Sequence, residues 1–278
     1  MQEPEGIPAL ITICFNQGEL GMTERIRKRM DEADLVLLGL GEELDITKLV
    51  QEDPWYQAKI ENIKNSWIIP YVKKLRIGQI AKDRCSVYMQ LCSMLEHKNY
   101  FIVSICQDGA IKDAGFDESR IVEPCGGYEK LQCSEKCSGK LHEVSSKLQN
   151  QIKDFLDGKL TEADLEEPCC PDCGKPLVFN NINAAHYAEE GYLNQWMRYK
   201  KWLQGTVNKN VCLLEIGVGM KYPTVIRWPF EKITFYNQKA ELFRVHSKLY
   251  QMAGEIKERG FGICREPEEF LKELSNGI

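Results

Sequence analysis

Two close pairs of cysteines are the residues in this sequence best suited to bind a metal. Cys133 and Cys137 have three residues between them, whereas Cys170 and Cys173 have two, with a proline inside the pair and a glycine after it. Two short loops that each present two thiolates suit a tetrahedral zinc ion. Because all four ligands would be sulfur, such a site would be structural and would leave no position open for a substrate.

The spacing leaves two alternatives open. Cys169 stands directly before Cys170 and offers the same ligand atom. The gap between the two pairs is longer than in most zinc ribbons, which is compatible with a helix inserted between two hairpins. A plainer interpretation is that these are four ordinary buried cysteines.

Composition restricts the class of protein to which the chain can belong. It has 278 residues, 12 cysteines, 43% hydrophobic residues and a formal net charge of -5. The length suits one large or two small globular domains, and the mildly acidic balance disfavours a nucleic-acid binder. No apolar run is long enough for a membrane-spanning helix, and no basic residue precedes the apolar stretch 7–15. We expect a soluble cytoplasmic protein with reduced thiols and no membrane partner.

Short apolar runs alternate with amphipathic stretches outside the cysteine region. The runs predict buried strands, and their alternation with helices predicts an α/β fold with a parallel sheet covered on both faces. Strands are predicted at 34–38, 100–105, 211–216 and 240–245, with a shorter candidate at 233–236, and helices at 22–33 and 85–96.

The character of the chain changes between the strands. From 126 to 204 it is rich in glycine and cysteine, with a polar helical stretch at 143–160 and an aromatic stretch at 187–203, and no apolar strand of the earlier kind is expected there. We predict a Rossmann-like large domain from 1–125 and 205–278, a helical excursion at 44–80, and an inserted zinc-binding domain at 126–204.

Three predicted strands end in residues able to form a ligand site. Gly39-Leu-Gly41 follows the first strand, but the acids Glu42 and Glu43 after it would repel a phosphate. Gly217-Val218-Gly219 follows the most apolar strand, and Cys106 and Asp108 follow another. The carboxyl ends of parallel strands meet at one edge, where α/β sheets bind nucleotides. Ordinary tight turns are the plainer alternative for both glycine pairs.

The order of strand, glycine turn, four-cysteine insertion and second glycine turn resembles the sirtuin family of NAD-dependent protein deacylases and ADP-ribosyltransferases. The likeness covers about residues 33–274 and is densest at 99–137 and 213–245. It is greatest to the microbial branch often encoded beside macrodomain proteins. The resemblance implies a Rossmann-like domain, a small zinc domain, and NAD or ADP-ribose bound between them, with a protein substrate or partner.

The resemblance also assigns site residues, several of which depart from the family pattern. The catalytic set would be Cys125, Cys106, Asp108 and Asn183, where the family has histidine or glutamine, asparagine, aspartate and, in the microbial branch, arginine. The cofactor-binding set would be Gly39, Gly41, Asp108, Gly217, Val218, Gly219, His246 and Cys264. His246 replaces the asparagine that holds the adenosine ribose.

These departures support three hypotheses. The chain is an NAD-consuming ADP-ribosyltransferase or deacylase, a catalytically inactive sirtuin-fold binding or regulatory module, or a redox sensor that uses Cys106 and Cys125. Small buried cysteines at both positions, and a simply packed His246, are the plainer interpretations.

Overall fold

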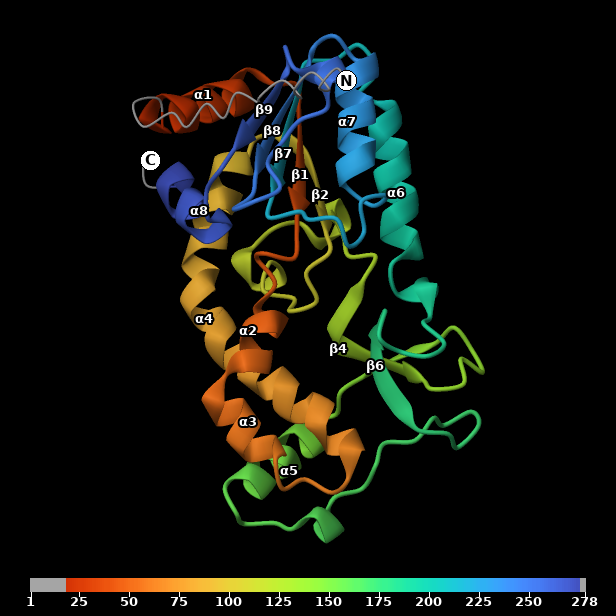
Figure 1. Cartoon of the computed structure of the whole chain (residues 1–278). Coiled ribbons are helices and arrows are strands. Elements are labelled where there is room, and N and C mark those ends of the chain that lie inside the picture. Colours follow the sequence, from red (N-terminus) through yellow and green to blue (C-terminus); the bar gives the residue numbers. More distant parts are fainter. Residues whose placement is uncertain (1–18, 276–278) are drawn as a thin grey trace, which may run out of the picture.

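The computed structural model describes residues 19–275, which form a six-stranded parallel sheet with helices on both faces and a smaller module beside it (Figure 1). The strand order is β3-β2-β1-β7-β8-β9. The strands are β1 (Leu35–Leu40), β2 (Asn99–Ser104), β3 (Ile121–Val122), β7 (Val211–Ile216), β8 (Ala240–Val245) and β9 (Gly260–Ile263). The prediction of a Rossmann-like α/β fold is confirmed.

Helices cover both faces of this sheet, which explains why its strands are continuous apolar runs. All six residues of β1 are buried, and successive side chains face opposite cores. One face carries α1, α4 and α8, and the other carries α6 and α7 (Figure 1). The bounds are α1 (Glu19–Glu32), α4 (Ile69–Leu95), α6 (Leu193–Gln204), α7 (Arg227–Tyr236) and α8 (Pro267–Ser275).

The small module is built on a three-stranded antiparallel sheet in the order β5-β4-β6. Its elements are β4 (Gly126–Cys133), β5 (Leu141–Glu143), β6 (Leu177–Asn181) and α5 (Ser146–Leu156). Ser145 caps α5, because its side chain accepts a hydrogen bond from the Leu148 amide at 3.2 Å. The sequence analysis expected no apolar strand of the earlier kind here, and these strands are of another kind: they are only partly buried and lack the long apolar runs of the large sheet.

A helical segment follows β1 and packs beside the small module. It consists of α2 (Ile46–Glu52) and α3 (Pro54–Ile60), capped by Asp45 and Asp53, and then α4. The stretch predicted as a separate helix at 85–96 is the end of α4, which runs unbroken past residue 80. Single 3-10 turns lie at Ser66–Ile68, Lys112–Ala114, Glu118–Arg120, Glu162–Asp164, Glu189–Gly191 and Gly254–Ile256.

Two further parts of the chain differ from the sequence prediction. The strand candidate at 233–236 is wrong, because these residues form the last turns of α7, where an apolar run of this length fits either structure. Helix α6 precedes residue 205 but packs on the large sheet, with the ring centroids of Tyr199 and Phe101 5.3 Å apart. Across the described residues, no helix is long and apolar enough to cross a membrane. The stretch 7–15 lies outside the described residues.

Candidate functional site

The four cysteines of the two pairs meet in the small module. Their sulfur atoms all lie within 4.8 Å of one another, with Cys133 Sγ 3.5 Å from Cys173 Sγ and Cys137 Sγ 3.6 Å from Cys170 Sγ. A tetrahedron of sulfurs about 2.3 Å from a zinc ion has edges of about 3.8 Å. The donor set and its dimensions therefore fit zinc.

The structure separates Cys169 from this cluster. Cys169 is exposed and its thiol contacts the carbonyl oxygen of Glu167 at 3.5 Å, whereas Cys170 is buried among the other three thiols. The turn of the second pair closes with a hydrogen bond from the Gly174 amide to the Cys170 carbonyl at 2.8 Å. Cys170 and not Cys169 thus lies in the position of a ligand.

The two glycine turns meet at the carboxyl edge of the large sheet, between β1 and β7. Strand order reverses its direction at this point, which is where open α/β sheets bind ligands. The Glu43 amide donates to the Gly217 carbonyl at 3.1 Å, and the Gly41 amide to the Ile216 carbonyl at 2.9 Å. Gly217 has a φ of +67°. A side chain at Gly41 would overlap the backbone of Gly217 and Val218, so neither position readily accepts another residue.

The acids after the first turn occupy this edge. Glu43 accepts a hydrogen bond from the Ser247 amide at 3.1 Å and another from the Ser247 hydroxyl. Glu42 packs against Gly219, and its Oε2 is buried with no hydrogen-bond partner among the described residues. The negative charge predicted to oppose a phosphate therefore lies directly on the second glycine turn.

His246 lies beside the same turn and is held there as a neutral side chain. Its Nδ1 accepts hydrogen bonds from the Lys248 and Leu249 amides, both at 3.0 Å, and burial lowers its pKa. Because Nδ1 is already an acceptor, its 3.2 Å contact with Glu43 is not an ion pair. Cys264 is exposed nearby, with its thiol 3.3 Å from the Ser247 carbonyl.

An arginine that the sequence analysis did not single out supports the second glycine turn. Arg227 at the start of α7 donates to the Val218 carbonyl at 2.8 Å and to the Leu249 carbonyl. It lies 3.9 Å from Glu215, which is fully buried and paired with Arg244 at 2.7 Å. Glu215 stands within the apolar run of β7, and the sequence alone does not show which residues pair with it there. The network was therefore not predicted.

Two carboxylates join the loops that follow β1 and β2. Asp108 accepts from the Ile46 amide at 2.8 Å and the Ala110 amide at 2.9 Å, and Asp45 accepts from the Gln107 amide at 3.2 Å. Burial, and then the charge of Asp45, raise the pKa of Asp108 to about 7. Asp108 thus has a positioning role in these loops, whichever ligand binds beside them.

The raised pKa of Asp108 predicts that the free energy of unfolding depends on pH. The folded chain binds a proton at Asp108 between its ordinary pKa of 3.8 and about 7, whereas the unfolded chain has released it. The stability of the wild type should therefore fall, relative to an Asp108→Asn variant, as pH rises from about 4 to about 7, by on the order of 2–4 kcal/mol. Urea unfolding of both proteins across this range measures the difference; a constant difference would contradict the assignment.

Cys106 and Cys125 both lie at the site but are poorly suited to act as nucleophiles. Their side chains are 4% and 3% exposed, and the Cys106 thiol lies 3.2 Å from the Gly41 carbonyl. Burial raises the pKa of Cys125 to about 12, and burial together with Asp108 raises that of Cys106. Because the thiolate is the reactive form, the geometry favours the buried-cysteine interpretation for both.

We therefore expect neither thiol to react in the native protein. With a disulfide reagent at about pH 8, exposed Cys264 should be modified within minutes, whereas Cys106 and Cys125 should react only after unfolding. Mass spectrometry of proteolytic fragments distinguishes the positions. Rapid native modification of either buried thiol would restore the redox-sensor hypothesis.

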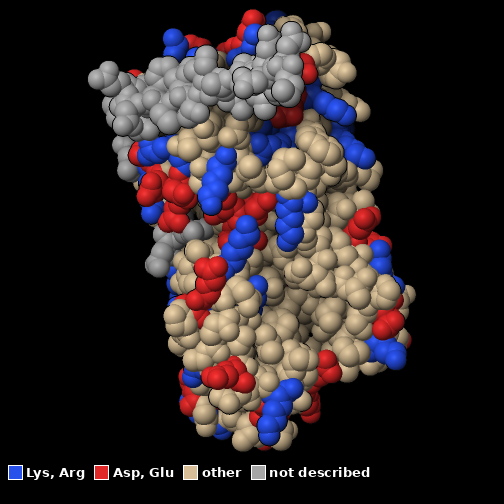
Figure 2. Space-filling model, viewed as in Figure 1, with Lys and Arg blue, Asp and Glu red and all other residues tan. Residues whose placement is uncertain are grey.

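An apolar cavity of about 310 Å³ lies between the helical segment and the small module. Trp67, Tyr71 and Phe179 line it, and Asn183 lies on its wall, donating to Gln107 Oε1 at 3.2 Å. Figure 2 shows a mainly uncharged area at the centre and right of this face, just below mid-height, with charged side chains above it, along the edges and near the bottom. Through Asn183, one wall of the cavity is thus joined to the loop after β2.

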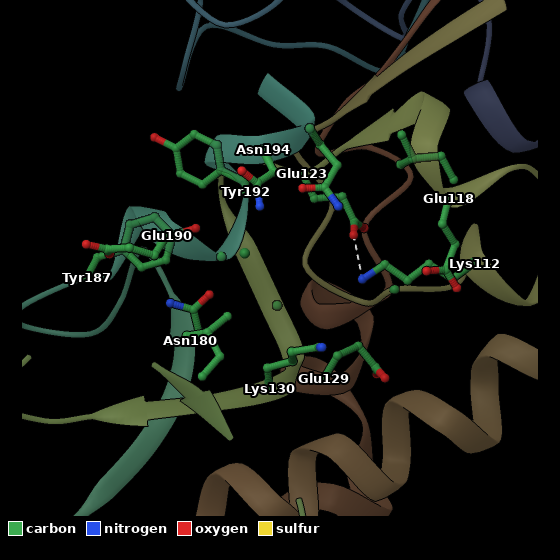
Figure 3. Close-up of a pocket in the computed structure, with 17 residues that line it drawn as sticks. Lys112, Glu118, Glu123, Glu129, Lys130, Asn180, Tyr187, Glu190, Tyr192 and Asn194 are labelled. Atoms are coloured by element: carbon green, nitrogen blue, oxygen red, sulfur yellow. Dashed lines mark ion pairs between the residues drawn. The ribbon is translucent and has the colours of Figure 1, made fainter. Parts of the chain in front are cut away.

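A second cavity, of about 320 Å³, lies beside Gly126 and Gly127 (Figure 3). Tyr187 and Tyr192 form one wall, with ring centroids 6.1 Å apart. On the other side Lys112 and Glu123 form a 2.6 Å ion pair. The charges of Glu129, Lys130 and Glu190 are paired instead with residues outside the lining, so most of the lining charges already have partners.

The sequence of this chain is similar to those of known ADP-ribosyltransferases. No model of a known protein family matches the chain. It is 22% identical over 265 residues to a protein ADP-ribosyltransferase of Staphylococcus aureus, covering 87% of this chain and 84% of that protein. It is also 26% identical over 151 residues to a probable bifunctional ADP-ribose hydrolase/ADP-ribosyltransferase of Fusarium oxysporum f. sp. cubense, covering 52% of this chain and 25% of that protein.

Solved structures with this arrangement are Sir2 proteins. Sir2Tm bound to a propionylated peptide superimposes with a TM-score of 0.54 at 13% identity, covering 91% of this chain and 97% of that one. A Sir2 complex with a p53 peptide and NAD+ gives 0.53 at 13% identity, with the same coverage. The chain has the sirtuin fold. The bacterial match agrees with the microbial branch of sirtuins indicated by the sequence.

Proposed function

We propose that this sirtuin-fold chain binds NAD at the carboxyl edge of its parallel sheet and transfers the ADP-ribosyl group to a protein acceptor or an acyl-lysine. The observation that carries the proposal is the meeting of the Gly41 and Gly217 turns where strand order reverses. The named activity of the bacterial relative supports the same chemistry. Because Gly217 and Gly219 have no side chains, a pyrophosphate could approach the backbone closely there.

The chain's own residues would position the reactants. NAD supplies an activated bond between nicotinamide and ribose. Arg227 holds the Val218 carbonyl and so fixes the second glycine turn, and Asp108 fixes the loop after β2. The Asn183 amide lies on the wall of the apolar cavity and is held by its hydrogen bond to Gln107, so it would orient an acceptor group there.

A second candidate is a module that binds NAD or ADP-ribose without transferring it. It is favoured by the buried thiols of Cys106 and Cys125, which cannot act as bases near pH 7, and by Glu42 on the second glycine turn. We also propose that the four clustered thiols bind one structural zinc ion. The eleven cysteines within residues 19–275 form no disulfide, which suits a reducing compartment, so the cytoplasm is the proposed location.

One assay separates the two candidates. The purified protein is incubated with NAD, with and without a cellular protein extract, and released nicotinamide is measured by chromatography. A thermal-shift titration with NAD and with ADP-ribose is run beside it. Release above a heat-denatured control is the expected result. Stabilisation without release would leave only the binding module, and neither effect at millimolar NAD would exclude both.

A further inference from the structure

We propose that an open cavity at the amino-terminal edge of the parallel sheet binds an acidic peptide segment of a partner protein through one apolar anchor residue. The cavity has a volume of about 620 Å³ and lies where β1 and β2 begin, beside the end of α6. Figure 1 shows α6 running along the sheet toward this edge. Because the glycine turns lie at the carboxyl edge, this surface remains accessible when the opposite edge is occupied.

The floor of the cavity is apolar and held in place. Leu35 and Phe101 are buried strand residues, and Trp202 of α6 is partly exposed above them, with its ring centroid 5.9 Å from that of Phe101. The indole Nε1 of Trp202 donates to Asn99 Oδ1 at 2.8 Å. A fixed aromatic face of this kind can receive an aromatic or aliphatic side chain with little loss of conformational freedom.

The rim of the cavity is cationic. Its lining contains four cationic side chains but only one carboxylate, that of Asp34. The four are Arg120, Arg198, Lys201 and Lys209.

Two of these four cations are not neutralised by any residue that the structure describes. Asp117 lies 3.6 Å from Arg120, and its pKa is lowered mainly by hydrogen bonds to Ser119 and further by Arg120 and Arg198. Lys201 and Lys209 take part in no ion pair with any residue the structure describes. The chain as a whole has a net charge of -5, whereas four cations surround this apolar floor.

These features together select the ligand. Charge complementarity requires an anion, and the floor requires an apolar group beside it. The cavity is broad and open, so an extended segment with acidic residues on both sides of one apolar residue fits it better than a compact small molecule does. The partner is therefore inferred to be a protein with such a segment.

The test uses a fluorescent peptide in which aspartates and glutamates flank one central phenylalanine. Anisotropy titration of the full chain should give saturable binding that weakens as salt rises from about 50 to about 500 mM. The double variant Lys201→Glu, Lys209→Glu should bind at least about tenfold more weakly. Lys201→Glu alone should bind at least about threefold more weakly. Lys200→Glu is its control, matched in charge, since Lys200 is exposed on the same helix but does not line the cavity.

Three outcomes would overturn the proposal. Lys200→Glu could weaken binding as much as Lys201→Glu, which would show general attraction to a basic surface. A peptide with serine in place of phenylalanine could bind equally well, which would remove the role of the floor. A free mononucleotide could displace the peptide, which would assign the cavity to a small molecule. The readout needs no NAD, so its failure is distinct from failure of the proposed transferase activity.

Discussion

Replacing Cys170 by serine is expected to abolish metal binding and to unfold the small module. Serine is a poor zinc ligand, and without the ion the remaining three cysteines would no longer hold their two loops together. Structural zinc sites contribute folding free energy directly, with binding free energies of about 10–16 kcal/mol in small zinc-binding peptides. Elemental analysis should give one zinc per wild-type chain and almost none in Cys170→Ser.

Cys169→Ser is the matched control for this change. Cys169 is the neighbouring residue, is exposed, and lies outside the cluster. Its variant should retain one zinc and unfold at the wild-type temperature. If Cys169→Ser lost the metal while Cys170→Ser kept it, the ligand assignment drawn from the cluster would be reversed.

The second large effect is expected at Gly41, where the two glycine turns meet. The Cβ of Gly41→Ala would overlap the Val218 Cα and the Gly217 carbonyl oxygen, which are backbone atoms and cannot rotate away. We expect destabilisation of about 3 kcal/mol or more, together with loss of NAD binding, because the turns must move apart. Chemical unfolding and a thermal-shift titration with NAD measure the two effects.

Gly78 provides a control for the loss of glycine itself. It lies within helix α4, is exposed, and has nothing within 4 Å of the position that a Cβ would take. Gly78→Ala should therefore stabilise the chain by about 0.5–1 kcal/mol, since alanine is the better helix former. A Gly41→Ala protein as stable as the wild type would show that the turns do not pack as described.

The sequence predicted the large sheet well because its strands are buried on both faces. The apolar run of β7 and the alternation of strands with helices identify such a sheet without knowledge of contacts. Strands β4 and β6 were missed because they are only partly buried, and β9 because Gly260–Ile263 contains two glycines. Spacing selected the cysteine cluster except for the choice between Cys169 and Cys170, since short loops bring ligands together locally.

The polar site was predicted less completely, because its contacts join distant segments. The strand end places Asp108, and the family resemblance places Asn183, near the ligand site. Neither shows that Asp108 holds the Ile46 amide or that Asn183 pairs with Gln107. The support of the second glycine turn by Arg227 depends on two loops that only the fold brings together. A signal was available in the sequence: arginine in an otherwise apolar stretch after a glycine turn requires a buried partner.

The most direct test of the account is a crystal structure of the protein soaked with NAD. We predict density for the pyrophosphate beside Gly217–Gly219, with the Glu42 carboxylate displaced from Gly219 and the nicotinamide end directed toward Gln107 and Asn183. Density for NAD in another cavity, or an unchanged Glu42 and no density at saturating NAD, would contradict the central claim that this edge of the sheet is an NAD site.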